Sequence, residues 1–78
     1  KSLPADIVKI DGSFVTEMMR NPVDRAMVDS INRLAHRLGM HTVAEFVGDT
    51  ETLESLRAMG VDYAQGAHVG VARQLGEH

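Results

Sequence analysis

The sequence contains no cysteine among its 78 residues, so disulfide bonds and thiolate metal sites are excluded. It also lacks a basic tract: 8 lysines and arginines stand against 11 acidic residues, for a net charge of −3. This balance argues against nucleic acid or an anionic membrane surface as the main partner. Apolar runs stay far below the roughly 18 residues of a membrane span. The length allows one small domain, which on folding buries only about 60% of the surface that its unfolded chain exposes.

Two familiar site patterns are also missing from the sequence. There is no phosphate-binding loop of the G-x-G-x-x-G type, and no two histidines have the i, i+4 spacing of a helical metal site. His36 and His41 are therefore expected in solvated or helix-dipole roles rather than as metal ligands.

Three short runs with apolar and β-branched residues predict strands, at residues 7–10, 41–45 and 61–66. Helical patterns fill the intervals: a short one at 13–20, then longer ones at 22–38 and 50–59. The order strand, helix, strand, helix, strand predicts an α/β fold with parallel strands and right-handed crossovers.

The helix ends are marked by capping residues. Asn21 followed by proline suits a helix start, and Gly39 suits its end. Asp49 or Thr50 can cap the second long helix, which Gly60 terminates. The first long helix carries one apolar stripe, at Met27, Ile31, Leu34, Ala35 and Leu38.

Three parallel strands with two main helices leave the sheet incompletely covered, because parallel sheets bury both faces. We therefore expect a segment of a doubly wound sheet or of a (β/α)8 barrel, which needs roughly 250 residues. An isolated segment of this kind exposes a strand edge or an apolar face, so we expect it to self-associate or to fold only loosely.

Lys9 is an unusual residue because it lies inside the apolar strand at 7–10. Strand alternation places Lys9 with Ile7 on one face, and Val8 with Ile10 on the other. Burying an ammonium group costs several kcal/mol unless it is paired. Two interpretations follow: a solvated lysine on an edge strand, or a site that needs a positive charge.

The next two strands also end on polar side chains, Glu45 and Gln65. Parity places Glu45 with Val43 and Gln65 with Tyr63. If these faces line a barrel interior, the two side chains gather with Lys9 at its carboxyl-terminal mouth, where barrel enzymes hold their catalytic groups. The spacing alone does not separate this arrangement from chance.

Three ordered segments carry a family resemblance: residues 3–15 (LPADIVKIDGSFV), 43–47 (VAEFV) and 56–66 (LRAMGVDYAQG). They resemble the carboxyl-terminal third of an EAL domain, and the resemblance extends to about residue 70. EAL domains are bacterial phosphodiesterases that linearise cyclic di-GMP, and degenerate members bind the nucleotide or partners without cleaving it. The resemblance implies that residues 1–78 are an incomplete piece of a (β/α)8 barrel.

The resemblance also implies roles for four residues. Lys9 resembles the lysine that holds and polarises the attacking water, and Glu45 resembles a ligand of the second of two Mg²⁺ or Mn²⁺ ions. Gln65 resembles the amide beside the substrate, and Asp11 resembles an acid that steadies the loop after the second strand. Two hard cations on carboxylate oxygens can activate water for attack on a phosphodiester.

Departures from the family pattern leave alternatives open. The Glu-Ala-Leu signature and the Asp-Asp-Phe-Gly metal motif are absent from the sequence. Gly48 occupies the usual position of a second glutamate, and Ala67 replaces a common aromatic residue. The parent is expected to be a cytoplasmic phosphodiesterase, with attachment to a membrane sensor and dimerisation left open. The alternatives are a degenerate EAL domain that senses cyclic di-GMP or binds proteins, and a free-standing α/β interaction domain closed by a partner chain.

Overall fold

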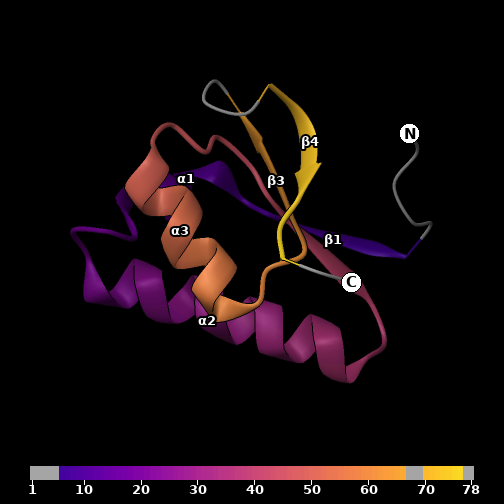
Figure 1. Ribbon diagram of the computed structural model, residues 1–78. Helices are drawn as coiled ribbons and strands as arrows, with labels where there is room; N and C mark the ends of the chain where they lie inside the picture. Colours follow the sequence, from indigo (N-terminus) through magenta and orange to yellow (C-terminus); the bar gives the residue numbers. More distant parts are fainter. Residues whose placement is uncertain (1–5, 67–69, 77–78) are drawn as a thin grey trace.

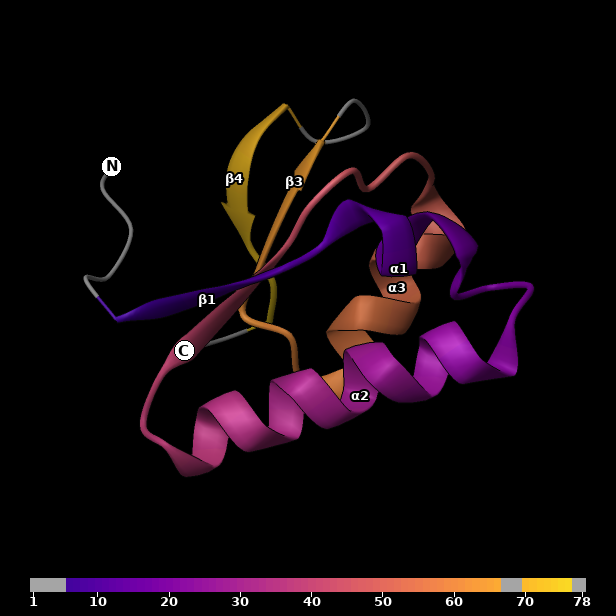
Figure 2. The ribbon, with the colours of Figure 1, turned by 180° about the vertical axis from the view of Figure 1, so that it is seen from behind.

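The computed structural model describes residues 6–66 and 70–76. Its elements alternate along the chain as the sequence predicts (Figure 1). They are β1 (Ile7–Ile10), α1 (Gly12–Glu17), α2 (Pro22–Arg37), β2 (His41–Ala44), α3 (Thr50–Met59), β3 (Tyr63–Gly66) and β4 (Gly70–Gln74). In the opposite views of Figures 1 and 2, α2 and α3 lie on the same side of the sheet. None of the helices in these ranges is long and apolar enough to cross a membrane.

The sheet has the order β1-β2-β3-β4, and β1, β2 and β3 run parallel, as predicted. β4 is antiparallel to β3 and was not predicted from the sequence. Its residues have no strong alternation of their own, and they become a strand because they pair with the free edge of β3. Strand formation depends on such tertiary context more than helix formation does.

Local capping explains where the helices begin and end. The Asn21 side chain accepts a hydrogen bond from the Val23 amide at 2.9 Å, and Pro22 opens α2. The Asp49 side chain accepts from the Thr52 amide at 2.7 Å, which identifies Asp49 as the cap of α3. Gly60 ends α3 with φ of 87°, a left-handed conformation that glycine adopts without strain.

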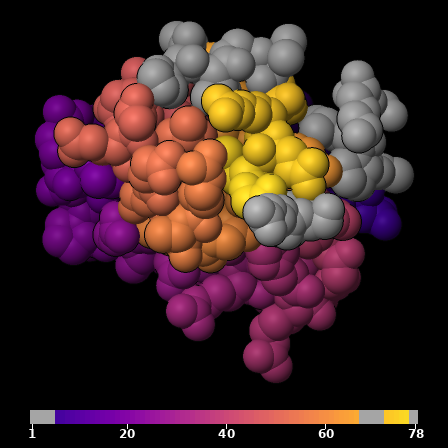
Figure 3. Space-filling model, viewed as in Figure 1, coloured from indigo at the N-terminus to yellow at the C-terminus, as the bar shows by residue number. Residues whose placement is uncertain are grey.

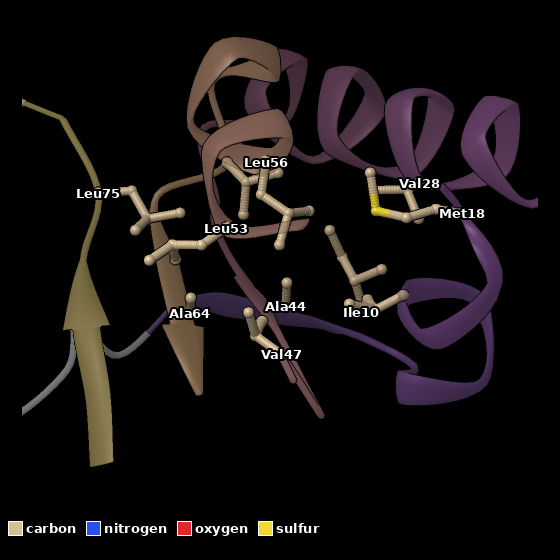
Figure 4. Close-up of a cluster of buried hydrophobic side chains, with 11 residues drawn as sticks. Ile10, Met18, Val28, Ala44, Val47, Leu53, Leu56, Ala64 and Leu75 are labelled. Atoms are coloured by element: carbon tan, nitrogen blue, oxygen red, sulfur yellow. The ribbon is translucent and has the colours of Figure 1, made fainter. Parts of the chain in front are cut away.

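A single hydrophobic core lies between the helices and one face of the sheet. Figure 4 shows Leu53 and Leu56 projecting from α3 toward Ala44 and Ala64 on the strands. The buried members of the core are Ile10, Val15, Met18, Val28, Ala44, Val47, Leu53, Leu56, Val61, Ala64 and Leu75. Leu75 follows β4, which lies beside α3 on the face shown in Figure 3. This core leaves the opposite face of the sheet without helices.

Only part of the apolar stripe predicted for α2 is buried. Ala35 is buried and Ile31 half-buried, whereas Met27, Leu34 and Leu38 are exposed. The most buried residues of α2 are Val28, Asn32 and Ala35. A count of apolar residues alone missed Asn32, whose burial depends on hydrogen bonds to other elements.

Candidate active site at the carboxyl ends of the strands

Strand register places Lys9 on the face of the sheet that carries no helices. Lys9 pairs with Val43 and Val43 with Tyr63, so these three residues form one row across the sheet. The next row joins Ile10, Ala44 and Ala64, which are buried in the helix-side core. Because neighbouring residues on a strand point to opposite faces, the row of Lys9 faces away from the helices. Lys9 is exposed.

Glu45 and Gln65 lie one position beyond the core row, at the carboxyl ends of β2 and β3. The Glu45 amide donates to the Ile10 carbonyl at 3.2 Å, and the Val47 amide donates to the Gln65 carbonyl at 3.0 Å. Glu45 is half-buried and Gln65 is exposed. Lys9 therefore lies two positions deeper along its strand, a distance of about 6–7 Å. The register confirms the predicted facing of Lys9 and adds this difference in depth, whereas the facing of Glu45 and Gln65, beyond the last regular pair of β2 and β3, stays a prediction.

Asp11 occupies the corresponding end of β1. It is exposed, and one of its carboxylate oxygens accepts a hydrogen bond from the Ser13 amide at 3.0 Å, which caps α1. The adjacent Gly12 packs against the side chain of Phe46, in the segment after β2. Asp11 thus lies next to a contact between the end of β1 and that segment, and its role in steadying a loop stays a prediction.

Phe46 is a residue of this region that sequence reasoning missed. Its φ of 62° lies in the left-handed region, which is costly for any residue with a bulky side chain. It is also 67% exposed, although most aromatic side chains are largely buried. No sequence signal indicated this conformation, since phenylalanine favours the extended backbone of a strand. Strained backbone of this kind is concentrated near functional sites.

The carboxylates near the strand ends suit a hard divalent cation but do not complete a site for one. Mg²⁺ and Mn²⁺ prefer carboxylate oxygen ligands, which Glu45 and Asp11 carry. Within residues 6–66 and 70–76, no three histidine, cysteine, aspartate or glutamate side chains converge. The described part of the chain can therefore contribute a ligand, and the remaining ligands would have to come from elsewhere. Ala67 lies outside the described residues.

A buried polar network occupies the opposite end of the strands. Asp62 Oδ2 accepts hydrogen bonds from the Thr42 amide at 2.9 Å and from His36 Nε2 at 2.7 Å. Thr42 Oγ1 donates to Asn32 Oδ1 at 2.6 Å, and Asn32 Nδ2 donates to the Met59 carbonyl at 3.1 Å. His36 thus has a structural partner rather than a purely solvated role.

The electrostatics of this network favour an ionised Asp62. Burial by itself would raise the pKa of Asp62, but hydrogen bonds from His36 and Thr42, with the charge of His36, outweigh it and lower that pKa. In barrel enzymes the amino-terminal ends of the strands serve stability and the carboxyl-terminal ends serve chemistry. The network therefore belongs to the stability of the fold.

Two surface hollows lie on the helix layer, away from the strand ends. One, of about 400 Å³, is lined by residues of α2 and by Met59. The other, of about 110 Å³, is lined by Val8 and by Ile31, Leu34, Ala35 and Leu38 of α2. Both are open, and neither includes Lys9, Glu45 or Gln65.

Known proteins resemble this chain both in sequence and in fold. The cyclic di-GMP phosphodiesterase PdeB of Shewanella oneidensis is 41% identical over 78 residues, which is 100% of this chain and 9% of that protein. The cyclic di-GMP phosphodiesterase PdeF of Escherichia coli is 40% identical over 75 residues, 96% of this chain and 10% of that protein. The chain spans about a tenth of the length of these curated relatives.

Solved structures agree with the sequence comparison. The EAL domain protein from Listeria monocytogenes EGD-e superposes with a TM-score of 0.78 at 40% identity, over 94% of this chain and 30% of that chain. The PaMucR phosphodiesterase in complex with c-di-GMP gives a TM-score of 0.81 at 33% identity, over 92% and 29%. This likeness confirms the predicted fold class, a piece of a (β/α)8 barrel. A family model for the EAL domain matches residues 1–72, and the chain therefore belongs to the EAL domain family.

Proposed function

We propose that this chain is part of a bacterial signalling phosphodiesterase that hydrolyses cyclic di-GMP to linear pGpG with two divalent metal ions. The observation that carries this proposal is the strand register in a member of the EAL family. It supports a common site for Lys9, Glu45 and Gln65, on the face without helices and toward the carboxyl ends of three adjacent parallel strands. Barrel enzymes place their chemistry at that end.

Each of these residues has a chemistry suited to phosphodiester hydrolysis. Lys9 carries a positive charge that can orient a water molecule and stabilise negative charge on the phosphoryl oxygens. Glu45 can serve as one carboxylate ligand of a metal ion, and Gln65 can hydrogen-bond the substrate through its amide. Bound Mg²⁺ or Mn²⁺ would supply activation of water and stabilisation of the leaving oxygen. Asp11 supports the start of α1 beside the segment after β2.

Some properties of the whole protein belong to the same proposal. Residues 1–78 would form the carboxyl-terminal part of an EAL domain, and earlier strands would supply the other metal ligands. The domain would act in the cytoplasm, bind cyclic di-GMP and dimerise. Support for the nucleotide comes from relatives named as cyclic di-GMP phosphodiesterases and from PaMucR, whose structure contains c-di-GMP.

A second candidate function is a degenerate EAL domain that binds cyclic di-GMP as a sensor, or binds proteins, without catalysis. Gly48 favours this alternative, because it provides no side chain to anchor the segment after β2. It is exposed, and a methyl group built on it would meet only the Phe46 carbonyl oxygen, at 4.0 Å. A glutamate at this position would have had room.

The test uses the purified full-length protein with cyclic di-GMP, in Mg²⁺ or Mn²⁺ and in excess chelator. Metal-dependent formation of pGpG is expected. Calorimetric binding of the nucleotide without product would favour the sensor. If the protein neither binds nor cleaves cyclic di-GMP, the proposed function is wrong.

A further inference from the structure

Three residues in close contact directly follow three residues of the candidate site. Gly12 follows Asp11, Phe46 follows Glu45, and Gly66 follows Gln65. They lie at the ends of β1, β2 and β3, so contacts among them join all three strand ends. We refer to Gly12, Phe46 and Gly66 as the strand-end contact group.

The contact between Gly12 and Phe46 leaves no room for another side chain. A methyl group built on Gly12 would overlap Cγ and Cδ2 of Phe46 and would lie 2.8 Å from its Cβ. Gly12 is buried in the first turn of α1, and alanine suits a helical backbone. Glycine is therefore required there by the neighbouring phenylalanine and not by backbone conformation.

The contact between Gly66 and the segment after β2 involves backbone atoms. A methyl group on Gly66 would overlap the Val47 amide nitrogen and would lie 2.9 Å from the Val47 carbonyl oxygen. The φ of Gly66 is 148°, which also disfavours other residues. This close approach accompanies the hydrogen bond from the Val47 amide to the Gln65 carbonyl, at 3.0 Å.

Regular pairing between β2 and β3 ends after Ala44, where Phe46 takes its left-handed conformation, so the β2–β3 ladder alone does not fix the ends of these two strands. Register between β2 and β3 is regular at Val43 and Ala44, and the next bond to Gln65 comes from Val47 rather than Phe46. Irregular pairing of this kind redirects side chains and is common beside active sites. Glu45 and Gln65 are the two candidate site residues that lie at this irregularity.

We propose that the strand-end contact group positions Glu45 and Gln65 relative to Lys9, with Gly12 and Phe46 acting as a size-matched pair. The proposal rests on the proposed function of the site. Phe46 rests on Gly12 and links β2 to β1, while its backbone rests against Gly66 and links β2 to β3. A side chain at position 12 would push Phe46 away and carry Glu45 with it. Gly12 and Phe46 act through Glu45 and are therefore positioning residues.

The test is a double-mutant cycle in the full-length protein, with Gly12→Ala, Phe46→Gly and the combination of both. Gly48→Ala is the matched control, since within residues 6–66 and 70–76 the nearest atom to its methyl group would be the Phe46 carbonyl oxygen, 4.0 Å away. Three quantities are measured for each variant: melting temperature, amide hydrogen exchange at Val47, and kcat and KM for cyclic di-GMP per folded molecule.

Gly12→Ala should lower the melting temperature by roughly 2–8 °C, as overpacking does in domains of this kind. It should speed exchange at Val47 and reduce kcat about tenfold or more, because small displacements of catalytic groups are costly. Phe46→Gly removes the side chain that links β2 to β1, so it should also speed exchange at Val47 and lower kcat, but by less than Gly12→Ala, since glycine tolerates φ of 62° without strain. In the double variant all three quantities should return close to those of Phe46→Gly. Gly66→Ala should not be rescued, because its overlap is with backbone.

Three results would overturn the proposal. A Gly12→Ala variant that matches Gly48→Ala, or a double variant as impaired as Gly12→Ala, would show that the pair is not coupled. Wild-type kcat and KM in the folded fraction of Gly12→Ala would show a purely structural role. If the wild type binds cyclic di-GMP without cleaving it, nucleotide affinity replaces kcat as the readout. Absence of hydrolysis in the wild type counts against the proposed function. Melting temperature and amide exchange still decide whether Gly12 and Phe46 are coupled.

Discussion

Replacing Asp62 by alanine should destabilise the domain by about 1–4 kcal/mol. Asp62 is 6% exposed and accepts hydrogen bonds from the Thr42 amide and from His36 Nε2. Alanine would leave the amide of Thr42, a residue that is 0% exposed, without this acceptor. An unsatisfied buried donor costs about 1–3 kcal/mol. The His36 side chain is 37% exposed, so solvent screening limits its share to about 1 kcal/mol or less.

The assay is equilibrium unfolding in urea of the EAL domain that contains this chain. A change of this size should lower the urea midpoint clearly at unchanged m-value, because the folded and unfolded surfaces stay the same. Asp29→Ala is the matched control: Asp29 pairs with Arg33 at 3.0 Å, but the arginine side chain is 77% exposed. It should cost about 0.5 kcal/mol or less. If the two variants lose the same stability, the assignment of the buried network to fold stability is wrong.

The remaining predictions concern pH, the metal ligand and the isolated chain. Because the pKa of Asp62 is lower in the folded state than in the unfolded state, its contribution is present above the unfolded value of about 3.9 and is lost as pH falls through the folded pKa. The stability gap between wild type and Asp62→Asn should therefore narrow in acid titrations monitored by circular dichroism, and a gap that stays constant down to pH 2 would contradict this. Glu45→Gln in the full-length protein should lower turnover in Mg²⁺ and regain part of it at high Mn²⁺, whereas Glu51→Gln should behave as the wild type; equal loss at every metal concentration would argue against a ligand role. The isolated 78-residue chain should self-associate, because β1 is an edge strand and Leu34 and Leu38 are exposed, and it should not cleave cyclic di-GMP. A compact monomer in light scattering, or chelator-sensitive turnover, would refute that expectation.

Local signals predicted most of the secondary structure. The ends of α2 and α3 follow from capping residues such as Asn21, Asp49 and Gly60, which act within a few residues of the chain. The facing of Lys9 follows from strand alternation alone. These features could be read from the sequence because each depends on neighbours along the chain.

Features that depend on contacts between distant segments could not be predicted in this way. β4 exists because β3 offers a free edge, and the buried side of α2 includes Asn32 because Thr42 and Met59 satisfy its amide. The difference in depth between Lys9 and Glu45 requires the register between β1 and β2. The left-handed conformation of Phe46 contradicts the local preference of phenylalanine for extended backbone. Its side chain packs against Gly12, a residue distant in the sequence.

The proposed catalytic role of Lys9 is tested most directly by turnover of cyclic di-GMP in the Lys9→Ala variant of the full-length protein, with melting temperature measured on the same sample. If Lys9 acts on turnover and not on the stability of the fold, its removal should shift the melting temperature by about 2 °C or less. Loss of a charge-stabilising group should lower kcat roughly a hundredfold, or about 3 kcal/mol. A variant that melts many degrees lower while its folded fraction keeps wild-type kcat would contradict the account.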